Sequence, residues 1–285
     1  MTLALHPFEV DVGGGLRLHG DRGGAGQPLL LLHGFTGSTG TWTALRQSVG
    51  ERFETIALDL PGHGRSSAPA EPGRYALGTL AADLSRVLDA LDVEQPAVLG
   101  YSLGARAALR FALDRPERVG ALVLESVSAG VDDAGERAAR LAADRALADS
   151  IERDGIEAFV ARWETLPLWE SQRILPAEAR AAQRAARLAN VPRGLANSLR
   201  GAGVAAEAPV TGRLTSLNAP TLVVAGALDA KFVALGEAIA ARAPRARFVA
   251  VEGAGHAVHL ERPDVLAAHV EEFLGGVVPL ARTSH

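Results

Sequence analysis

The feature that most constrains the fold of this 285-residue chain is an alternation of short apolar runs with longer helical patterns. The runs that predict strands are residues 8–12, 16–19, 29–32, 55–58, 97–99, 121–124, 221–225 and 247–251. The helical patterns are residues 42–49, 77–91, 103–113, 232–243 and 263–273. Parallel strands need long crossover connections, which are usually helices, so this alternation predicts a mostly parallel sheet with helices on both faces. Ligands of such sheets bind beyond the carboxyl ends of the strands.

The alternation stops after Glu125 and resumes at Pro220. Between them, residues 127–210 contain one helical pattern after another and no convincing strand. The simplest arrangement is a helical insertion that caps the carboxyl edge of the sheet, where it would exclude water and shape specificity. We therefore expect a core domain of residues 1–126 and 211–285 and a helical cap of residues 127–210.

The pentapeptide Gly100-Tyr101-Ser102-Leu103-Gly104 lies between a predicted strand and a predicted helix. In this context Gly-x-Ser-x-Gly is the nucleophile elbow of the α/β-hydrolases, a sharp turn that exposes the serine hydroxyl above the sheet. A side chain in place of either glycine would clash in so tight a turn. The motif predicts the α/β-hydrolase fold, with an eight-stranded, mostly parallel sheet and Ser102 as the reactive serine.

A serine hydroxyl needs a base, and the base needs an acid that orients it. In this fold the chain order is serine, acid, histidine. Of the eight histidines, His256 is the one in a loop directly after the last predicted strand. Asp229 follows the preceding strand, although an aspartate there is also typical of a helix N-cap. Glu125, at the end of another strand, is the alternative acid.

Stabilising a developing negative charge on an oxygen requires two backbone N–H donors. One comes from the residue after the serine, here Leu103. The other comes from the loop after the third strand, His33-Gly34-Phe35, in which Phe35 is the expected donor.

Arg106 lies one helical turn after Ser102 and therefore on the same helix face. Helical side chains lean toward the N-terminus, so Arg106 is expected to reach back toward the serine, which suits an anionic substrate. A structural salt bridge is the alternative. The arginine stripes of the predicted cap are typical of solvated helix faces, so charge counting alone does not select a ligand contact there.

Composition excludes several classes of protein. A formal net charge of −4 provides no basic surface for nucleic acid, and the absence of Cys excludes disulfides and thiolate catalysis. No apolar run approaches the length of a membrane span, and the N-terminus lacks the pattern of a secretory signal. We expect a cytoplasmic enzyme that uses no metal and no cofactor and acts on a small molecule.

Beyond these signals, the sequence resembles one enzyme family, the 2-succinyl-6-hydroxy-2,4-cyclohexadiene-1-carboxylate synthases of menaquinone biosynthesis. These are lyases with the α/β-hydrolase fold, and the resemblance extends over residues 29–273. Its distinctive segments are residues 32–38, 100–106, 124–126, 135–137, 140–144, 195–199, 229–232 and 255–259, with Trp163 and Pro167. One departure is Ala105, where the family usually has a glycine, and the added methyl should tighten packing between helix and strand.

The resemblance implies a triad of Ser102, Asp229 and His256, with Phe35 and Leu103 as oxyanion donors. The substrate contacts that it implies are Tyr101, Arg106, Arg140, Trp163, Arg187 and Lys231. The implied substrate is a polycarboxylate, 2-succinyl-5-enolpyruvyl-6-hydroxy-3-cyclohexene-1-carboxylate, which loses pyruvate after proton abstraction. Arginine suits such a substrate because it binds carboxylates through paired hydrogen bonds. A serine hydrolase, either a carboxylesterase or a carbon–carbon bond hydrolase, remains the alternative, because the same triad serves both.

Overall fold

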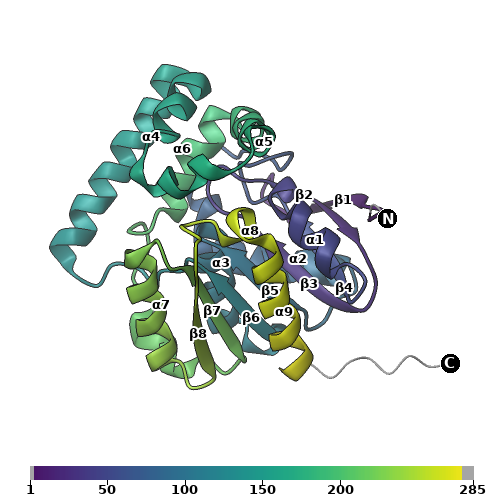
Figure 1. Cartoon of the computed structure of the whole chain (residues 1–285). Coiled ribbons are helices and arrows are strands. Elements are labelled where there is room, and N and C mark those ends of the chain that lie inside the picture. Colours follow the sequence, from purple (N-terminus) through teal and green to yellow (C-terminus); the bar gives the residue numbers. More distant parts are fainter. Residues whose placement is uncertain (1–2, 278–285) are drawn as a thin grey trace.

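The computed structural model describes residues 3–277, so residues 1–2 and 278–285 of the predicted core domain lie outside the described residues. A single eight-stranded sheet has the order β1-β2-β4-β3-β5-β6-β7-β8 (Figure 1). Its strands are β1 (His6–Asp11), β2 (Arg17–Gly23), β3 (Gln27–Leu32), β4 (Phe53–Leu58), β5 (Ala97–Tyr101), β6 (Ala121–Glu125), β7 (Thr221–Gly226) and β8 (Ala246–Val251). All eight predicted runs are confirmed as strands, with small shifts of their bounds.

The direction of the strands decides where their ends meet. Strand β2 pairs antiparallel with β1 and β4, whereas every pairing from β4 to β8 is parallel. In this register Leu32 lies beside Gly100, and Tyr101 lies beside Glu125. The loops that follow β3, β5, β6 and β7 therefore emerge together at one edge of the sheet, which we call the carboxyl edge.

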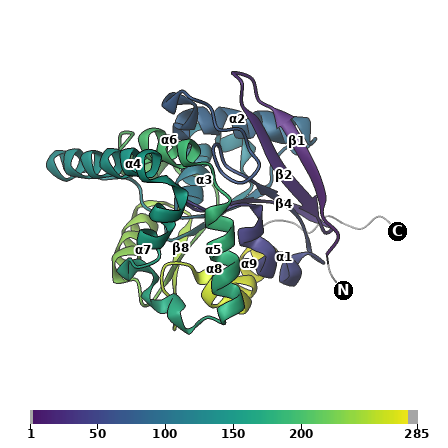
Figure 2. The same cartoon turned by 90° about the horizontal axis from the view of Figure 1, so that it is seen from above.

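Helices cover both faces of the sheet (Figures 1 and 2). The helices of the core are α1 (Thr43–Val49), α2 (Leu77–Ala90), α3 (Leu103–Asp114), α7 (Ala230–Arg242), α8 (Val258–Glu261) and α9 (Pro263–Val277). Buried side chains of α2, α3 and α7 form one apolar cluster with alternate strand residues such as Leu30 and Leu32. Those of α1 and α9 form a second cluster with the intervening residues such as Leu29 and Leu31. This period-two division of one strand is what a sheet buried on both faces requires.

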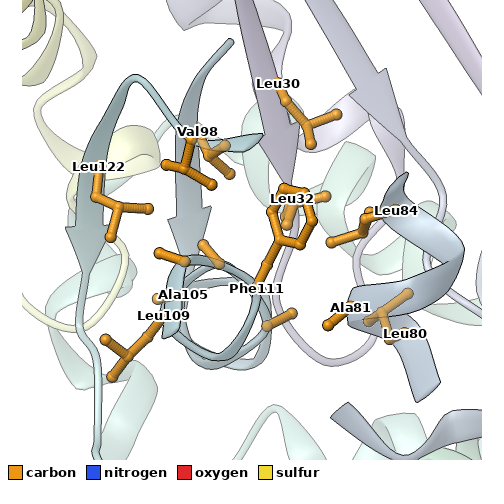
Figure 3. Close-up of a cluster of buried hydrophobic side chains, with 14 of the residues drawn as sticks. Leu30, Leu32, Leu80, Ala81, Leu84, Val98, Ala105, Leu109, Phe111 and Leu122 are labelled. Atoms are coloured by element: carbon orange, nitrogen blue, oxygen red, sulfur yellow. The ribbon is translucent and has the colours of Figure 1, made fainter. Parts of the chain in front are cut away.

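Ala105 lies in the first of these clusters and is fully buried. Figure 3 shows it on α3, in the same apolar cluster as Val98 and Leu122 of the sheet and Phe111 of its own helix. The methyl group is therefore part of the packing between helix and sheet, and its tightening effect relative to glycine stays a prediction.

The chain between β6 and β7 is helical, as expected. It comprises α4 (Ala134–Trp163), η4 (Pro167–Ile174), α5 (Ala177–Leu188), α6 (Pro192–Ala202) and η5 (Thr211–Ser216). Helices α4, α5 and α6 gather beyond the carboxyl edge (Figures 1 and 2) and enclose a third apolar cluster that includes Ile151, Phe159 and Leu195. Gly155, with φ of +84°, interrupts the helical backbone of α4.

Three short 3-10 helices complete the described chain: η1 (Thr39–Trp42), η2 (Pro72–Tyr75) and η3 (Pro116–Arg118). Within residues 3–277, none of the helices has both the length and the apolar character needed to span a bilayer.

Candidate active site

Ser102 occupies the sharp turn from β5 into α3, with φ of +51° and ψ of −106°. A Cβ on Gly100 would meet the backbone of Gly104, and a Cβ on Gly104 would overlap the carbonyl oxygen of Leu32. The turn is therefore possible only with glycine on both sides. A non-glycine residue at positive φ is strained and persists where its surroundings hold it, which is common at functional sites.

His256 lies between Ser102 and Asp229. Its Nε2 is 3.3 Å from Ser102 Oγ, and its Nδ1 is 2.8 Å from Asp229 Oδ2. A carboxylate on Nδ1 keeps the proton there and leaves Nε2 free to accept the proton of the hydroxyl. Asp229 Oδ1 also accepts a hydrogen bond from Phe232 N–H at 3.4 Å, so the two roles considered for this aspartate, acid and helix N-cap, coexist.

Glu125, the alternative acid, holds a different histidine. Its Oε1 is 2.8 Å from Nδ1 of His259 and accepts the backbone N–H of the same residue at 3.1 Å. Both side chains are fully buried. The structure thus pairs His256 with Asp229 and assigns Glu125 to a neighbouring pair below the cavity.

The two expected oxyanion donors both line the cavity above Ser102. Leu103 is the first residue of α3, so its N–H has no acceptor within the helix. Phe35 lies in the loop after β3. That loop is held by His33, whose Nδ1 donates to Gly34 O at 2.8 Å and whose Nε2 accepts from Leu60 N–H at 3.0 Å. Burial lowers the pKa of His33 to about 4, so its ring is neutral in this role.

A cavity of about 680 Å³ lies between the carboxyl edge and the helices above it. Ser102, His256 and Asp229 line it. Five of the six predicted substrate contacts also line it: Tyr101, Arg106, Arg140, Trp163 and Lys231. The cavity has the size of a small-molecule site.

Arg106 is the cation closest in sequence to the serine, and it is held by backbone rather than by an acid. Its Nη1 donates to O of Ala202, the last residue of α6, at 2.8 Å, and its Nη2 donates to O of the C-cap residue Gly203 at 3.0 Å. Among residues 3–277, no carboxylate lies within ion-pair distance of it, so the salt-bridge alternative is wrong for the described chain. Burial lowers the pKa of Arg106 to about 10, which leaves it protonated at neutral pH.

Arg140 and Arg187, the two substrate contacts predicted in residues 127–210, have different environments. Arg140 lines the cavity and donates to Asp144 at 2.9 Å. Arg187 is not among the lining residues; it donates to Glu164 at 3.1 Å and lies over the ring of Trp169, 5.2 Å from its centroid. Trp169 does line the cavity, so the indole lies between Arg187 and the cavity, and contact of Arg187 with a substrate stays a prediction.

Sequence reasoning missed four acidic residues that line the cavity: Asp132, Asp133, Glu136 and Asp144. Asp133 caps α4 by accepting Glu136 N–H at 2.8 Å, and this acidic N-terminal signature was available in the sequence. Asp144 is 4% exposed, and burial raises its pKa despite the neighbouring Arg140. The cavity lining contains both acidic and basic side chains. Binding of an anionic ligand therefore depends on which of the basic side chains have no acidic partner.

The fold and this site define the class of the protein as an α/β-hydrolase-fold protein with a serine–histidine–aspartate constellation at the carboxyl edge. Residues 27–263 match the family described as "alpha/beta hydrolase fold". A Bacillus subtilis (strain 168) protein, provisionally named 2-succinyl-6-hydroxy-2,4-cyclohexadiene-1-carboxylate synthase, is 41% identical over 253 residues, 89% of this chain and 92% of the relative. A Klebsiella pneumoniae protein named as the same synthase is 32% identical over 258 residues, 89% of this chain and 96% of the relative. The chain belongs to the 2-succinyl-6-hydroxy-2,4-cyclohexadiene-1-carboxylate synthase family, which confirms the resemblance.

Solved structures agree with this assignment. The structure described as MenH from S. aureus is 30% identical, with a TM-score of 0.84, and the match covers 97% of this chain and 99% of that one. A thermophilic esterase from Thermogutta terrifontis, described as malate bound, is 28% identical with a TM-score of 0.84, over 95% of this chain and 99% of that one. Since one backbone serves both a synthase and an esterase, the site and the sequence relatives carry the functional argument.

Proposed function

We propose that this protein is a carbon–oxygen lyase that eliminates pyruvate from 2-succinyl-5-enolpyruvyl-6-hydroxy-3-cyclohexene-1-carboxylate. The product would be 2-succinyl-6-hydroxy-2,4-cyclohexadiene-1-carboxylate, an intermediate of menaquinone biosynthesis. Membership of the synthase family supports this reaction. The structural observation that carries it is a serine–histidine pair facing a cavity that is also lined by Arg106, a partly buried arginine with no ion-pair partner among residues 3–277.

In this proposal Ser102 acts as a base rather than as a nucleophile. His256 polarises the hydroxyl, and Ser102 Oγ removes the ring proton next to the succinyl carbonyl while His256 takes up the hydroxyl proton. Asp229 holds the imidazole in the tautomer that can accept it and stabilises the charged ring that forms. The electron pair left on the ring expels the enolpyruvyl oxygen, and the proton on His256 is available to the departing enolpyruvate, which becomes pyruvate.

The negative charge that develops on the succinyl carbonyl oxygen needs donors that are already in place. The N–H groups of Leu103 and Phe35 would supply them. Removal of one such donor typically costs an enzyme roughly 3 kcal/mol of transition-state stabilisation. Their orientation is fixed before substrate arrives, by the start of α3 for Leu103 and by the His33-anchored loop for Phe35.

Arg106, Arg140 and Lys231 would bind the carboxylates of the substrate. Arg106 retains N–H donors beyond the two used on α6, and its burial strengthens a charge-assisted hydrogen bond. Arg140 shares its charge with Asp144, so it would bind substrate less strongly than Arg106. Arg187 would join them only after exchanging Glu164 for a substrate carboxylate.

Residues 127–210 would serve as the cap of this site, on a core formed by the remainder of the chain. Trp163 and Leu147 of this segment line the cavity opposite Ser102. Such a cover favours elimination because water reaching an enol intermediate or an activated serine would open hydrolytic side reactions.

A serine hydrolase is not favoured. The relatives at 41% and 32% identity are named as the synthase. A hydrolase of apolar esters also has no use for a guanidinium without an ion-pair partner in the cavity of its serine.

The test supplies the enolpyruvyl substrate and measures pyruvate release beside cleavage of a p-nitrophenyl ester. We expect pyruvate release by the wild type and almost none by Ser102→Ala, which should keep its circular-dichroism spectrum and melting temperature. Ester cleavage without pyruvate release would overturn the lyase assignment in favour of a hydrolase. Full pyruvate release by Ser102→Ala would remove the serine from the mechanism.

A further inference from the structure

The position of His256 depends on a loop with little regular structure. The imidazole is carried by the segment between β8, which ends at Val251, and α8, which begins at Val258. Its distance from Ser102 is therefore set by whatever holds this backbone. In loops without a strand or helix partner, side chains must satisfy the buried backbone groups.

Glu261 satisfies the two amides that flank His256. Its Oε2 accepts Gly255 N–H at 2.7 Å, and its Oε1 accepts Ala257 N–H at 3.3 Å. One carboxylate thus holds the backbone immediately before and immediately after the histidine. Gly255 and Ala257 are both buried and Glu261 is half-buried, so water is a poor substitute for the lost acceptor.

Other anchors hold other groups of the same loop. Leu228 N–H donates to Ala254 O at 2.9 Å, and Arg262 Nη1 donates to Glu252 O at 2.9 Å. Ser126, at the end of β6, donates its Oγ–H to His256 O at 2.8 Å. Glu125 holds His259 by its N–H and by its ring. These contacts fix carbonyls of the loop and the start of α8, whereas the amides on both sides of His256 depend on Glu261.

We propose that Glu261 is a positioning residue for His256. By fixing the amides of Gly255 and Ala257, its carboxylate sets the imidazole between Ser102 and Asp229, although it touches neither substrate nor reacting atoms. The proposal rests on the proposed function in so far as His256 acts through Ser102. A misplacement of about 1 Å by a distant change can cost roughly 100-fold in rate, so the loop is a site where a small displacement has a large effect.

The experiment uses the full chain with Glu261→Ala and Glu261→Gln, and with Glu252→Gln as the matched control. Glu252 belongs to the same loop, and its side chain is exposed. The first readout is the rate at which a fluorophosphonate labels Ser102, which reports serine activation without the substrate. The second is the far-downfield proton NMR signal of the His256–Asp229 hydrogen bond.

For Glu261→Ala we expect labelling and kcat to fall by up to about 100-fold, with KM little changed and the downfield signal broadened or lost. Glu261→Gln keeps one acceptor oxygen, so its loss should be smaller, and it serves as the test if the alanine variant does not fold. Glu252→Gln should match the wild type in every readout.

Wild-type labelling and an intact downfield signal in a folded Glu261 variant would overturn the positioning role, whatever the reaction. An equal effect of Glu252→Gln would also overturn it. A wild type that releases no pyruvate, while labelling still depends on Glu261, would instead remove the proposed reaction and leave the positioning role in place.

Discussion

The carboxyl edge of the sheet and the helices above it hold their polar side chains by different means. At the edge, the serine is fixed by a strained turn, and the buried histidines are fixed by hydrogen bonds to the backbone and to neighbouring side chains. In the helices above, charged side chains pair with one another near solvent, as Arg184 and Arg187 do with Glu164 and as Arg200 does with Asp149.

This difference separates two parts of the function. The edge is preorganised, so its contribution falls on the chemical step. The arginines of the helices above are held in ion pairs with acidic side chains. If a carboxylate substrate exchanges with those acids, as we propose for Arg187, their contribution is expected to fall on binding. Arg106 links the carboxyl edge to the helices above it, because it belongs to α3 and donates hydrogen bonds to the carbonyls at the end of α6.

The largest effect is expected from Asp229→Asn at the edge. An amide cannot hold His256 in the required tautomer, and in serine proteases the equivalent change lowers kcat by about 10⁴-fold. Steady-state kinetics would show the loss in kcat with little change in melting temperature. The matched variant is Glu125→Gln, which perturbs the other histidine–carboxylate pair. Glu125→Gln should lower the melting temperature and reduce kcat much less than Asp229→Asn does. An equal loss of kcat in the two variants would show that the two histidine–carboxylate pairs do not differ in function.

Arg106→Ala tests the contact between α3 and the end of α6. A hydrogen bond to a charged group contributes about 1.5–3 kcal/mol, so KM should rise by roughly 10- to 100-fold. Arg110→Ala is the control, because Arg110 lies one turn further along α3 and pairs with Asp114 and Glu207. If KM is unchanged in Arg106→Ala, the buried guanidinium does not bind the substrate.

Acid should destabilise the edge through its buried histidines, whereas residues 127–210 contain no histidine. Burial, aided by the neighbouring His33, lowers the pKa of His63 from 6.5 to about 3. The unfolded chain therefore binds more protons between these pH values. The stability due to a neutral His63 is complete above pH 6.5 and decreases as pH falls toward 3. The decrease should be roughly 3 kcal/mol at pH 4.5 and on the order of 4–5 kcal/mol at pH 3.

His63→Asn keeps a donor for Pro61 O and removes the titration. The free energy of unfolding, measured by denaturant titration at pH 7 and pH 4.5, should fall less in this variant than in the wild type. His269→Asn on α9 is the control. An identical pH dependence in His63→Asn and the wild type would contradict the assignment.

The smallest effect is expected in the helices above the carboxyl edge. Glu164→Gln releases Arg187 from a partly exposed ion pair worth at most about 1 kcal/mol, so KM should fall by up to about five-fold. Glu170→Gln, which removes an exposed pair with Arg173, is the control and should leave KM unchanged. A KM that rises in Glu164→Gln would mean that the pair itself organises the substrate site.

Much of the edge was predictable because its signals are local. The elbow glycines, the apolar strands and the loop position of His256 each follow from a few consecutive residues. The partner of Arg106 was not predictable, because its acceptors, Ala202 O and Gly203 O, are backbone carbonyls almost a hundred residues away. The pattern of side chains in a sequence does not predict which way a distant backbone carbonyl points.

The class of the fold, the candidate serine and histidine, and the family all follow from local signals in the sequence. Strand period, tight-turn geometry and chain order leave few alternatives at these positions. The three-dimensional structure was needed to show that Asp229 meets His256 whereas Glu125 meets His259. It was also needed to show which arginines line the cavity, and that Glu261 accepts hydrogen bonds from the amides on both sides of His256. These depend on where separate segments meet, and packing of the whole chain sets that position.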